Sequence, residues 1–144
     1  MAGVGSFDLV LEEATAGEPD LHTSRMREFT VSVTLSSVTI DCADAATLAR
    51  FWADVLERKV DEGASPEFAS IGSEIGPGWS FVQVPEAKGP KNRVHVDLSV
   101  PDLGAEVERV VALGARSIAD REEGGFRWTT LADPEGNEFC LVAG

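Results

Sequence analysis

The chain has 144 residues, of which 43% are hydrophobic and 26% are charged, proportions that are ordinary for a single globular domain. Acidic residues outnumber basic ones by 25 to 12, and the net charge of −13 argues against nucleic acid or an anionic membrane as a partner. No apolar run approaches the roughly 20 residues that span a bilayer, and the N-terminus lacks the basic and apolar pattern of a signal peptide.

Residues 1–27 match no other part of the chain and carry no sustained apolar period. This predicts a flexible N-terminal extension followed by one domain over 28–144. Alternating apolar residues at 29–35 predict a short lead-in strand. The two cysteines make no disulfide framework, so a reducing cytoplasm is the expected location.

A first module is predicted over 36–86, beginning with an alternating strand at 37–42 and a helix at 45–57. Asp44 suits the helix N-cap, because its carboxylate can accept from backbone N–H groups of the first turn. The helix carries apolar residues three and four positions apart, which indicates one buried stripe. Further strands are expected near 58–62, 67–73 and 79–85.

A second module is predicted over 94–143, after a polar linker at 87–93. It begins with an alternating strand at 94–100 and a helix at 103–113. Its remaining strands are expected near 115–119, 126–132 and 138–142. The order of elements is therefore the same in both modules.

The two modules also correspond in their spacing. Ser37 lies 58 residues before His95, and Asp44 lies 58 residues before Asp102. A fixed offset of this kind indicates a duplicated unit. The sequence therefore predicts an α+β protein of two βαβββ modules related by a pseudo-twofold axis, with a site between their polar strand faces.

Alternation along the strands places polar side chains on one face and apolar side chains on the other. The apolar faces can pack against the helices, so the polar faces are the candidates for ligand contact. The polar faces are predicted to carry Ser37, Thr39, Asp41, Gln83, His95, Asp97 and Cys140. Trp79 and Trp128 leave two alternatives open, namely stacking on a planar ligand and packing in the core.

Three strings carry a family resemblance: Lys91-Asn-Arg-Val-His-Val-Asp-Leu, Phe51-Trp52 and Leu131-Ala-Asp-Pro-Glu-Gly-Asn-Glu-Phe-Cys-Leu. With the repeated element order, they resemble the vicinal oxygen chelate superfamily over residues 36–143, most of all its actinobacterial glyoxalase-like branch. That superfamily includes glyoxalase I, extradiol dioxygenases, and fosfomycin and bleomycin resistance proteins. The resemblance implies curved mixed sheets that form a cup, with the helices outside.

The resemblance also implies where a metal would bind. Metal-binding members place ligands on the first and last strands of each half, at positions that correspond to Ser37, Gln83, His95 and Cys140. Only His95 is a strong ligand for a hard divalent ion, Cys140 is a soft one, and neither Ser37 nor Gln83 supplies charge. A divalent metal is therefore possible, through His95 and Cys140 with help from Gln83, but not favoured. The glutamate that glyoxalase I uses as ligand and base has no match, which disfavours glyoxalase I and extradiol dioxygenase activity.

Two functions stay open from the sequence. One is an enzyme, a lyase or isomerase, that acts on a small oxygenated molecule with His95 as the catalytic residue. The other is a metal-free protein of the bleomycin-resistance kind that sequesters a small molecule. A homodimer is implied by the resemblance and by the frequency of twofold assemblies. In either case, ligand contacts are expected from Ser37, Thr39, Gln83, Asp97 and Trp128.

Overall fold

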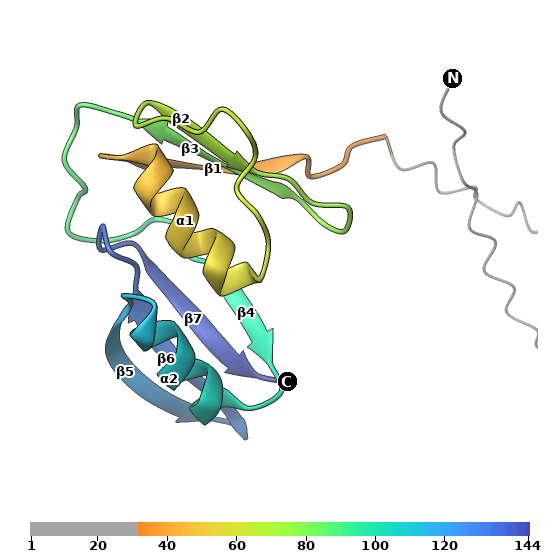
Figure 1. The fold of residues 1–144 in the computed structure, drawn as a ribbon. Helices are drawn as coiled ribbons and strands as arrows, with labels where there is room; N and C mark the ends of the chain where they lie inside the picture. The colour runs from red at the N-terminus through yellow and green to blue at the C-terminus, as the bar shows by residue number, and fades with distance from the viewer. Residues whose placement is uncertain (1–31) are drawn as a thin grey trace, which may run out of the picture. The chain divides into compact units, whose positions relative to one another are not determined.

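The computed structural model describes residues 32–144, which are coloured in Figure 1. Residues Val33–Gly144 form one compact unit. The extension predicted at 1–27 lies outside the described residues, as does most of the lead-in strand predicted at 29–35. Residues 32–35 of that segment form no strand.

The first half of the unit contains three strands and one helix. Strand β1 (Ser37–Cys42) leads into helix α1 (Ala45–Leu56), which is followed by β2 (Phe68–Ile71) and β3 (Gly78–Gln83). The strands form one sheet in the order β1-β3-β2, in which β1 runs parallel to β3 and β2 runs antiparallel to it. Helix α1 packs on one face of this sheet.

The second half repeats this arrangement with one more strand. It contains β4 (Asp97–Val100), α2 (Leu103–Ala112), β5 (Arg116–Glu123), β6 (Phe126–Ala132) and β7 (Glu138–Ala143). The sheet order is β4-β7-β6-β5, and β4 runs parallel to β7 as β1 does to β3. The predicted α+β class, with two β-rich modules, is confirmed.

The strand predicted near 58–62 is absent, and this part of the prediction was wrong. Helix α1 ends at Leu56, and its C-cap residue Glu57 has a left-handed backbone (φ 54°) that cannot continue the helix. The following segment makes one backbone hydrogen bond to β2, from Asp61 N to Ser70 O at 2.8 Å. Asp61 also accepts from the Ser70 hydroxyl and from Gly72 N. Its carboxylate therefore takes a backbone donor, Gly72 N, that a longer strand ladder would otherwise use.

The beginning of helix α1 follows from its sequence. Asp44 has an extended backbone and accepts from Thr47 N at 2.8 Å, which is the predicted N-cap contact. The helix then buries its apolar stripe against the sheet and the second half. Its buried residues are Ala45, Ala46, Leu48, Ala49, Phe51, Trp52, Ala53 and Val55.

One hydrophobic core extends through both halves. The ring centroid of Trp52 on α1 lies 4.7 Å from that of Trp79 on β3 and 4.8 Å from that of Phe139 on β7. The largest fully buried side chains are Trp52, Phe81, Phe139, Leu48, Ile71, Leu131, Leu141 and Val110. Among residues 32–144, no helix has the length and apolar character needed to cross a membrane.

The second half also contacts both ends of α1. The guanidinium of Arg109 on α2 donates to the carbonyls of Asp54 at 3.0 Å and Val55 at 2.9 Å. The carboxylate of Glu135, in the β6–β7 turn, accepts from the backbone N–H groups of Ala43 and Asp44. Helix α1 has no acidic residue in its first turn and no basic residue in its last. The second half therefore adds charges that complement the helix dipole to the one already supplied by the Asp44 cap.

Candidate functional site

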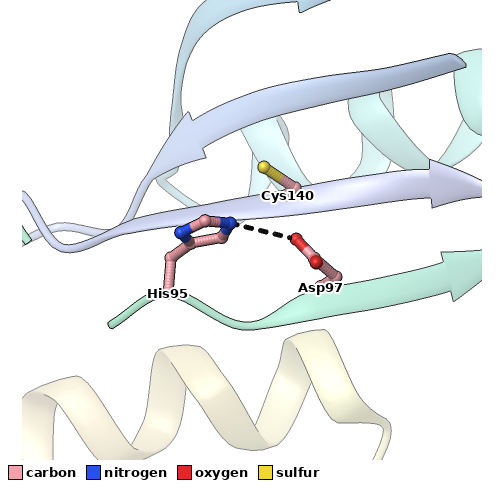
Figure 2. Close-up of side chains that lie close together, drawn as sticks. All are labelled: His95, Asp97 and Cys140. Atoms are coloured by element: carbon pink, nitrogen blue, oxygen red, sulfur yellow. Dashed lines mark ion pairs between the residues drawn. The ribbon is translucent and has the colours of Figure 1, made fainter. Parts of the chain in front are cut away.

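Three chemically active side chains converge on the polar face of the second sheet. The three donor atoms of His95, Asp97 and Cys140 lie within 4.8 Å of one another. Figure 2 shows all three on the same side of β4 and β7, with His95 Nε2 3.4 Å from Asp97 Oδ1. These residues form the His95 cluster.

The strand register explains why the cluster forms. Asp97 is paired with Cys140 in the parallel β4/β7 ladder. His95 precedes Asp97 by two residues, so the alternation of an extended chain returns it to the same face. The backbone remains attached to β7 at this point, since Cys140 N donates to Val96 O at 2.9 Å. The strand predicted at 94–100 is shorter in the structure, where β4 begins at Asp97. Its predicted alternation holds from His95 to Val100, whereas Val94 is exposed instead of packed on the apolar face.

The members of the cluster differ in exposure. The side chains of His95 and Asp97 are 54% and 60% exposed, whereas Cys140 is buried at 7%. Burial raises the pKa of the Cys140 thiol, and the nearby Asp97 carboxylate raises it further, while a hydrogen bond with Thr130 lowers it. The sulfur lies 3.5 Å from Thr130 Oγ1. The resting thiol is therefore protonated at neutral pH.

A hollow of about 470 Å³ opens over this cluster on the face of the second sheet. Trp128 and Thr130 on β6 form one wall, and Val142 on β7 extends the apolar part of the surface. Trp128 is half-buried, so its ring is available to a ligand as well as to its neighbours. The contact that the sequence predicted for Trp128 stays a prediction.

A larger groove of about 690 Å³ lies between β1 and the segment 91–96 that leads into β4. Its lining includes the aromatic side chains Trp52 and Trp79, together with Val38 and Ile40 on β1. Both tryptophans are nearly buried and also belong to the core. For Trp79, core packing and a place in the wall of a cavity are thus compatible rather than exclusive.

The groove and the hollow meet at one place. Lys91, His95 and Glu138 line both of them. Lys91 Nζ lies 3.3 Å from Glu138 Oε2, which holds the two side chains together at this junction. His95 is the member of the junction whose ring nitrogens can both accept and donate a hydrogen bond.

The structure separates the residues that the sequence placed in one ligand set. Thr39 and Asp41 line the groove, whereas Asp97, Trp128 and Cys140 line the hollow. Ser37 lines neither cavity, and neither does Gln83, whose amide donates to Ala43 O at 2.8 Å. The structure thus groups Asp97, rather than Gln83, with His95 and Cys140.

Three residues that line the groove were not predicted as site residues from the sequence, namely Asn92, Glu135 and Glu138. All three stand in the strings that carry the family resemblance, where no role was predicted for them. Asn92 anchors the linker to β7 by donating to Glu138 O at 3.4 Å. The position of Asn92 depends on the path of the linker across the second sheet. The polar and apolar alternation of the sequence does not predict that path.

The donor types of the His95 cluster fit a divalent metal. Imidazole, carboxylate and thiol are three of the ligands that zinc takes in proteins, and three protein ligands with an open position are typical of catalytic sites. Both exposed members can rotate toward the buried sulfur. The first half contributes no donor to this cluster.

Comparison with known proteins agrees with the resemblance seen in the sequence. Residues 37–142 match the family model of the glyoxalase-like domain. The chain belongs to this family. The match covers both halves and places the protein in the vicinal oxygen chelate superfamily, as predicted. No curated protein sequence matches the chain.

Solved structures similar to this glyoxalase-like domain have diverse described activities. A glyoxalase/bleomycin resistance protein/dioxygenase family enzyme from Burkholderia phytofirmans is 23% identical, with 77% of this chain and 98% of that chain covered and a TM-score of 0.65. A variant of the fosfomycin resistance protein FosX from Listeria monocytogenes, complexed with Mn(II) and 1S,2S-dihydroxypropylphosphonic acid, is 17% identical, with coverages of 80% and 92% and a TM-score of 0.66.

A lactoylglutathione lyase from Agrobacterium tumefaciens is 13% identical, with coverages of 80% and 96% and a TM-score of 0.60. At these identities the neighbours establish the fold alone. Because one fold hosts many chemistries, function has to be argued from the site.

Proposed function

We infer that the protein binds a small oxygenated molecule in the groove between β1 and segment 91–96. The polar end of this molecule would lie at His95. The observation that carries this proposal is the junction at His95, where the aromatic groove meets the polar hollow. Groove and hollow each fall in the size range of small-molecule sites, about 300–1,000 Å³. Apolar walls with a few convergent polar groups are typical of such sites.

The groove offers separate contacts to the apolar and polar parts of a ligand. Val38 and Ile40 on β1, with the edge of Trp79, would contact the apolar part, and Thr39 on β1 offers a hydroxyl that can donate to a ligand oxygen. Lys88 and Arg93 also line the groove and can donate to a ligand oxygen, while the acidic residues of the same lining, Asp41, Glu86, Glu135 and Glu138, leave the groove without an excess of positive charge. These contacts select for a molecule with oxygen at one end.

His95 is the residue proposed to act on the ligand. Its proximity to Asp97 favours one orientation of the imidazole, and its exposure leaves the ring accessible from the groove. In this position it would transfer a proton to or from a ligand group, as a general acid or base does. A divalent ion bound at the cluster would add polarisation of a ligand oxygen. The expected reaction class is a lyase or isomerase.

The alternative function is sequestration without chemistry, and the aromatic lining of the groove favours it. Trp79, Val38 and Ile40 form an apolar surface that can hold a molecule regardless of any reaction. The two functions differ in the fate of the ligand. A sequestering protein returns the ligand unchanged, whereas a lyase or isomerase returns a product that mass spectrometry or NMR detects.

We also propose that the protein is a homodimer. Support comes from the family resemblance and from the prevalence of twofold homodimers among soluble assemblies. Light scattering at micromolar concentration should give twice the mass of the chain, 15.3 kDa. A monomeric mass at that concentration would contradict this proposal.

The proposed function is tested with a thermal-shift screen of small oxygenated compounds, followed by calorimetric titration of any compound that stabilises the protein. His95→Ala should weaken binding by about tenfold or more, because truncating a central polar contact costs more than 1 kcal/mol. Ser37→Ala is the matched control, since Ser37 occupies the corresponding first-strand position outside both cavities. Equal affinities of the wild type and His95→Ala would contradict the role of His95.

A further inference from the structure

We propose that His95, Asp97 and Cys140 form a zinc site contained within the second half of the chain. The inference extends the proposed function, because the ion would lie beside the ligand site that contains His95. The resemblance places metal ligands in both halves of the chain, whereas here the donors converge on two strands of one sheet.

The distances favour one ion shared by the three side chains. Donor atoms that lie within 4.8 Å of one another need small movements to reach the separations of about 3.5 Å expected between ligands of tetrahedral zinc. The side chains that have to move are His95 and Asp97, which are both more than half exposed. Cys140 can stay where β7 holds it.

The donor chemistry distinguishes zinc from hard ions. Magnesium and manganese prefer oxygen ligands in octahedral sites, whereas thiolate sulfur favours zinc. A set of one sulfur, one nitrogen and one oxygen is therefore a zinc set. It contains a single carboxylate, which is a poor basis for Mg²⁺ or Mn²⁺.

Neighbouring residues support the sulfur as a ligand. Zinc binds the thiolate, so the proton of the Cys140 thiol is released to solvent when the ion enters. The Thr130 hydroxyl, 3.5 Å from the sulfur, can then donate to the thiolate. Such contacts with ligand atoms typically change metal affinity by about 10–100-fold.

Three protein donors are one fewer than zinc usually takes, so one coordination position is left for water or a ligand. The hollow lined by Trp128 and Glu138 gives access to this position from solvent. The site would thus be of the open kind found where a metal contacts a substrate, rather than the closed kind found in structural sites.

The test uses the full chain without an affinity tag, stripped with a chelator and titrated with Zn²⁺ or Co²⁺ in the absence of any organic molecule. We expect one Zn²⁺ per chain, weaker binding of Mn²⁺, and a near-ultraviolet thiolate-to-cobalt charge-transfer band. Cys140→Ser should abolish that band, and Cys42→Ser should leave it in place. Loss of the band in Cys42→Ser, or its persistence in Cys140→Ser, would overturn the proposal.

The remaining ligands are tested by competition with a chromophoric chelator. His95→Ala and Asp97→Asn should each weaken Zn²⁺ binding by at least about tenfold. Loss of a residue that only hydrogen-bonds to a metal ligand already lowers metal affinity by about 10–100-fold, so loss of a ligand should cost at least as much. Asp41→Asn removes the same charge from β1, and Gln83→Ala removes the donor expected from the sequence. Both controls should bind Zn²⁺ like the wild type.

Wild-type affinity of Asp97→Asn, or weakened binding by Gln83→Ala, would overturn this ligand set. Circular dichroism of each variant without metal verifies that it is folded. The titrations use metal alone, so their failure is separate from failure of ligand binding in the compound screen.

Discussion

Trp52 and Asp133 share a buried hydrogen bond across 81 residues of chain, from the indole N–H to Oδ2 at 3.1 Å. Asp133 also accepts from Glu135 N, Asn137 N and the Asn137 amide, each at 2.9 Å. The carboxylate can stay buried because four donors satisfy it. It thereby organises the β6–β7 turn and attaches that turn to α1.

The first prediction concerns this bond. Trp52→Phe keeps most of the aromatic volume but removes the donor, and we expect the free energy of unfolding to fall by about 1–3 kcal/mol. Chemical denaturation followed by circular dichroism measures the change. Trp79→Phe is the matched control, because it alters the same aromatic cluster without touching Asp133. A double-mutant cycle of Trp52→Phe with Asp133→Asn should give a coupling energy well above zero; additive effects would contradict the prediction.

The second prediction concerns the contacts at the C-terminal end of α1. Arg109→Ala leaves the carbonyls of Asp54 and Val55 without their donor, and we expect a loss of about 1–2 kcal/mol at this partly exposed position. Arg109→Lys should recover only part of it, since an ammonium lacks the planar fork that donates to both carbonyls. Arg50→Ala removes an exposed arginine from α1 itself and should change stability little. Equal losses in Arg50→Ala and Arg109→Ala would show that the carbonyl contacts are not responsible.

Much of the fold could be predicted because its signals are local. The strand at 37–42 and the helix at 45–56 follow from periodicity and from the Asp44 cap, and the repeat then predicts their counterparts. The failure at 58–62 has a local cause as well. Val60 is the single apolar residue between charged neighbours, and Asp61 takes hydrogen bonds from β2 and the residue after it instead of extending the sheet.

The site was predictable only within one sheet. Alternation places His95 and Asp97 on one face, and the register then adds Cys140 opposite Asp97. Gln83 has the corresponding position in the other half, yet its distance from His95 depends on how two sheets pack. That packing depends on contacts such as Trp52 with Asp133, between residues that no periodic pattern connects.

The third prediction concerns residues 1–27, which lie outside the described residues. Deleting them should leave the melting temperature of the domain nearly unchanged, because the hydrophobic core is formed by residues between Ile40 and Leu141. Differential scanning calorimetry of the full chain and the shortened chain makes the comparison. A decrease of many degrees on deletion would show that this segment contributes to the folded state.

The last prediction concerns Cys42 and the dependence of stability on pH. Burial, assisted by the acidic neighbours Glu135, Asp44 and Asp41, raises the pKa of this thiol from 9.0 to about 11. Below pH 9 the thiol is protonated in both the folded and unfolded states, so it adds no pH dependence there. Between pH 9 and about 11 the unfolded chain loses the proton while the folded protein keeps it. The folded state then binds more protons, and the free energy of unfolding must fall as the pH rises.

This dependence is measured by denaturant unfolding at several pH values across the range from 9 to about 11. The wild type should lose stability progressively, and Cys42→Ala should lose it less steeply, because the substituted chain has no thiol at this position to ionise on unfolding. Removing the sulfur also removes its contact with Val82 O, so Cys42→Ala is expected to be less stable at every pH. The two proteins are therefore compared by the slope of the free energy of unfolding against pH, and not by the constant difference between their stabilities. Parallel curves for the two proteins would mean that Cys42 ionises equally in the folded and unfolded states, contrary to its burial.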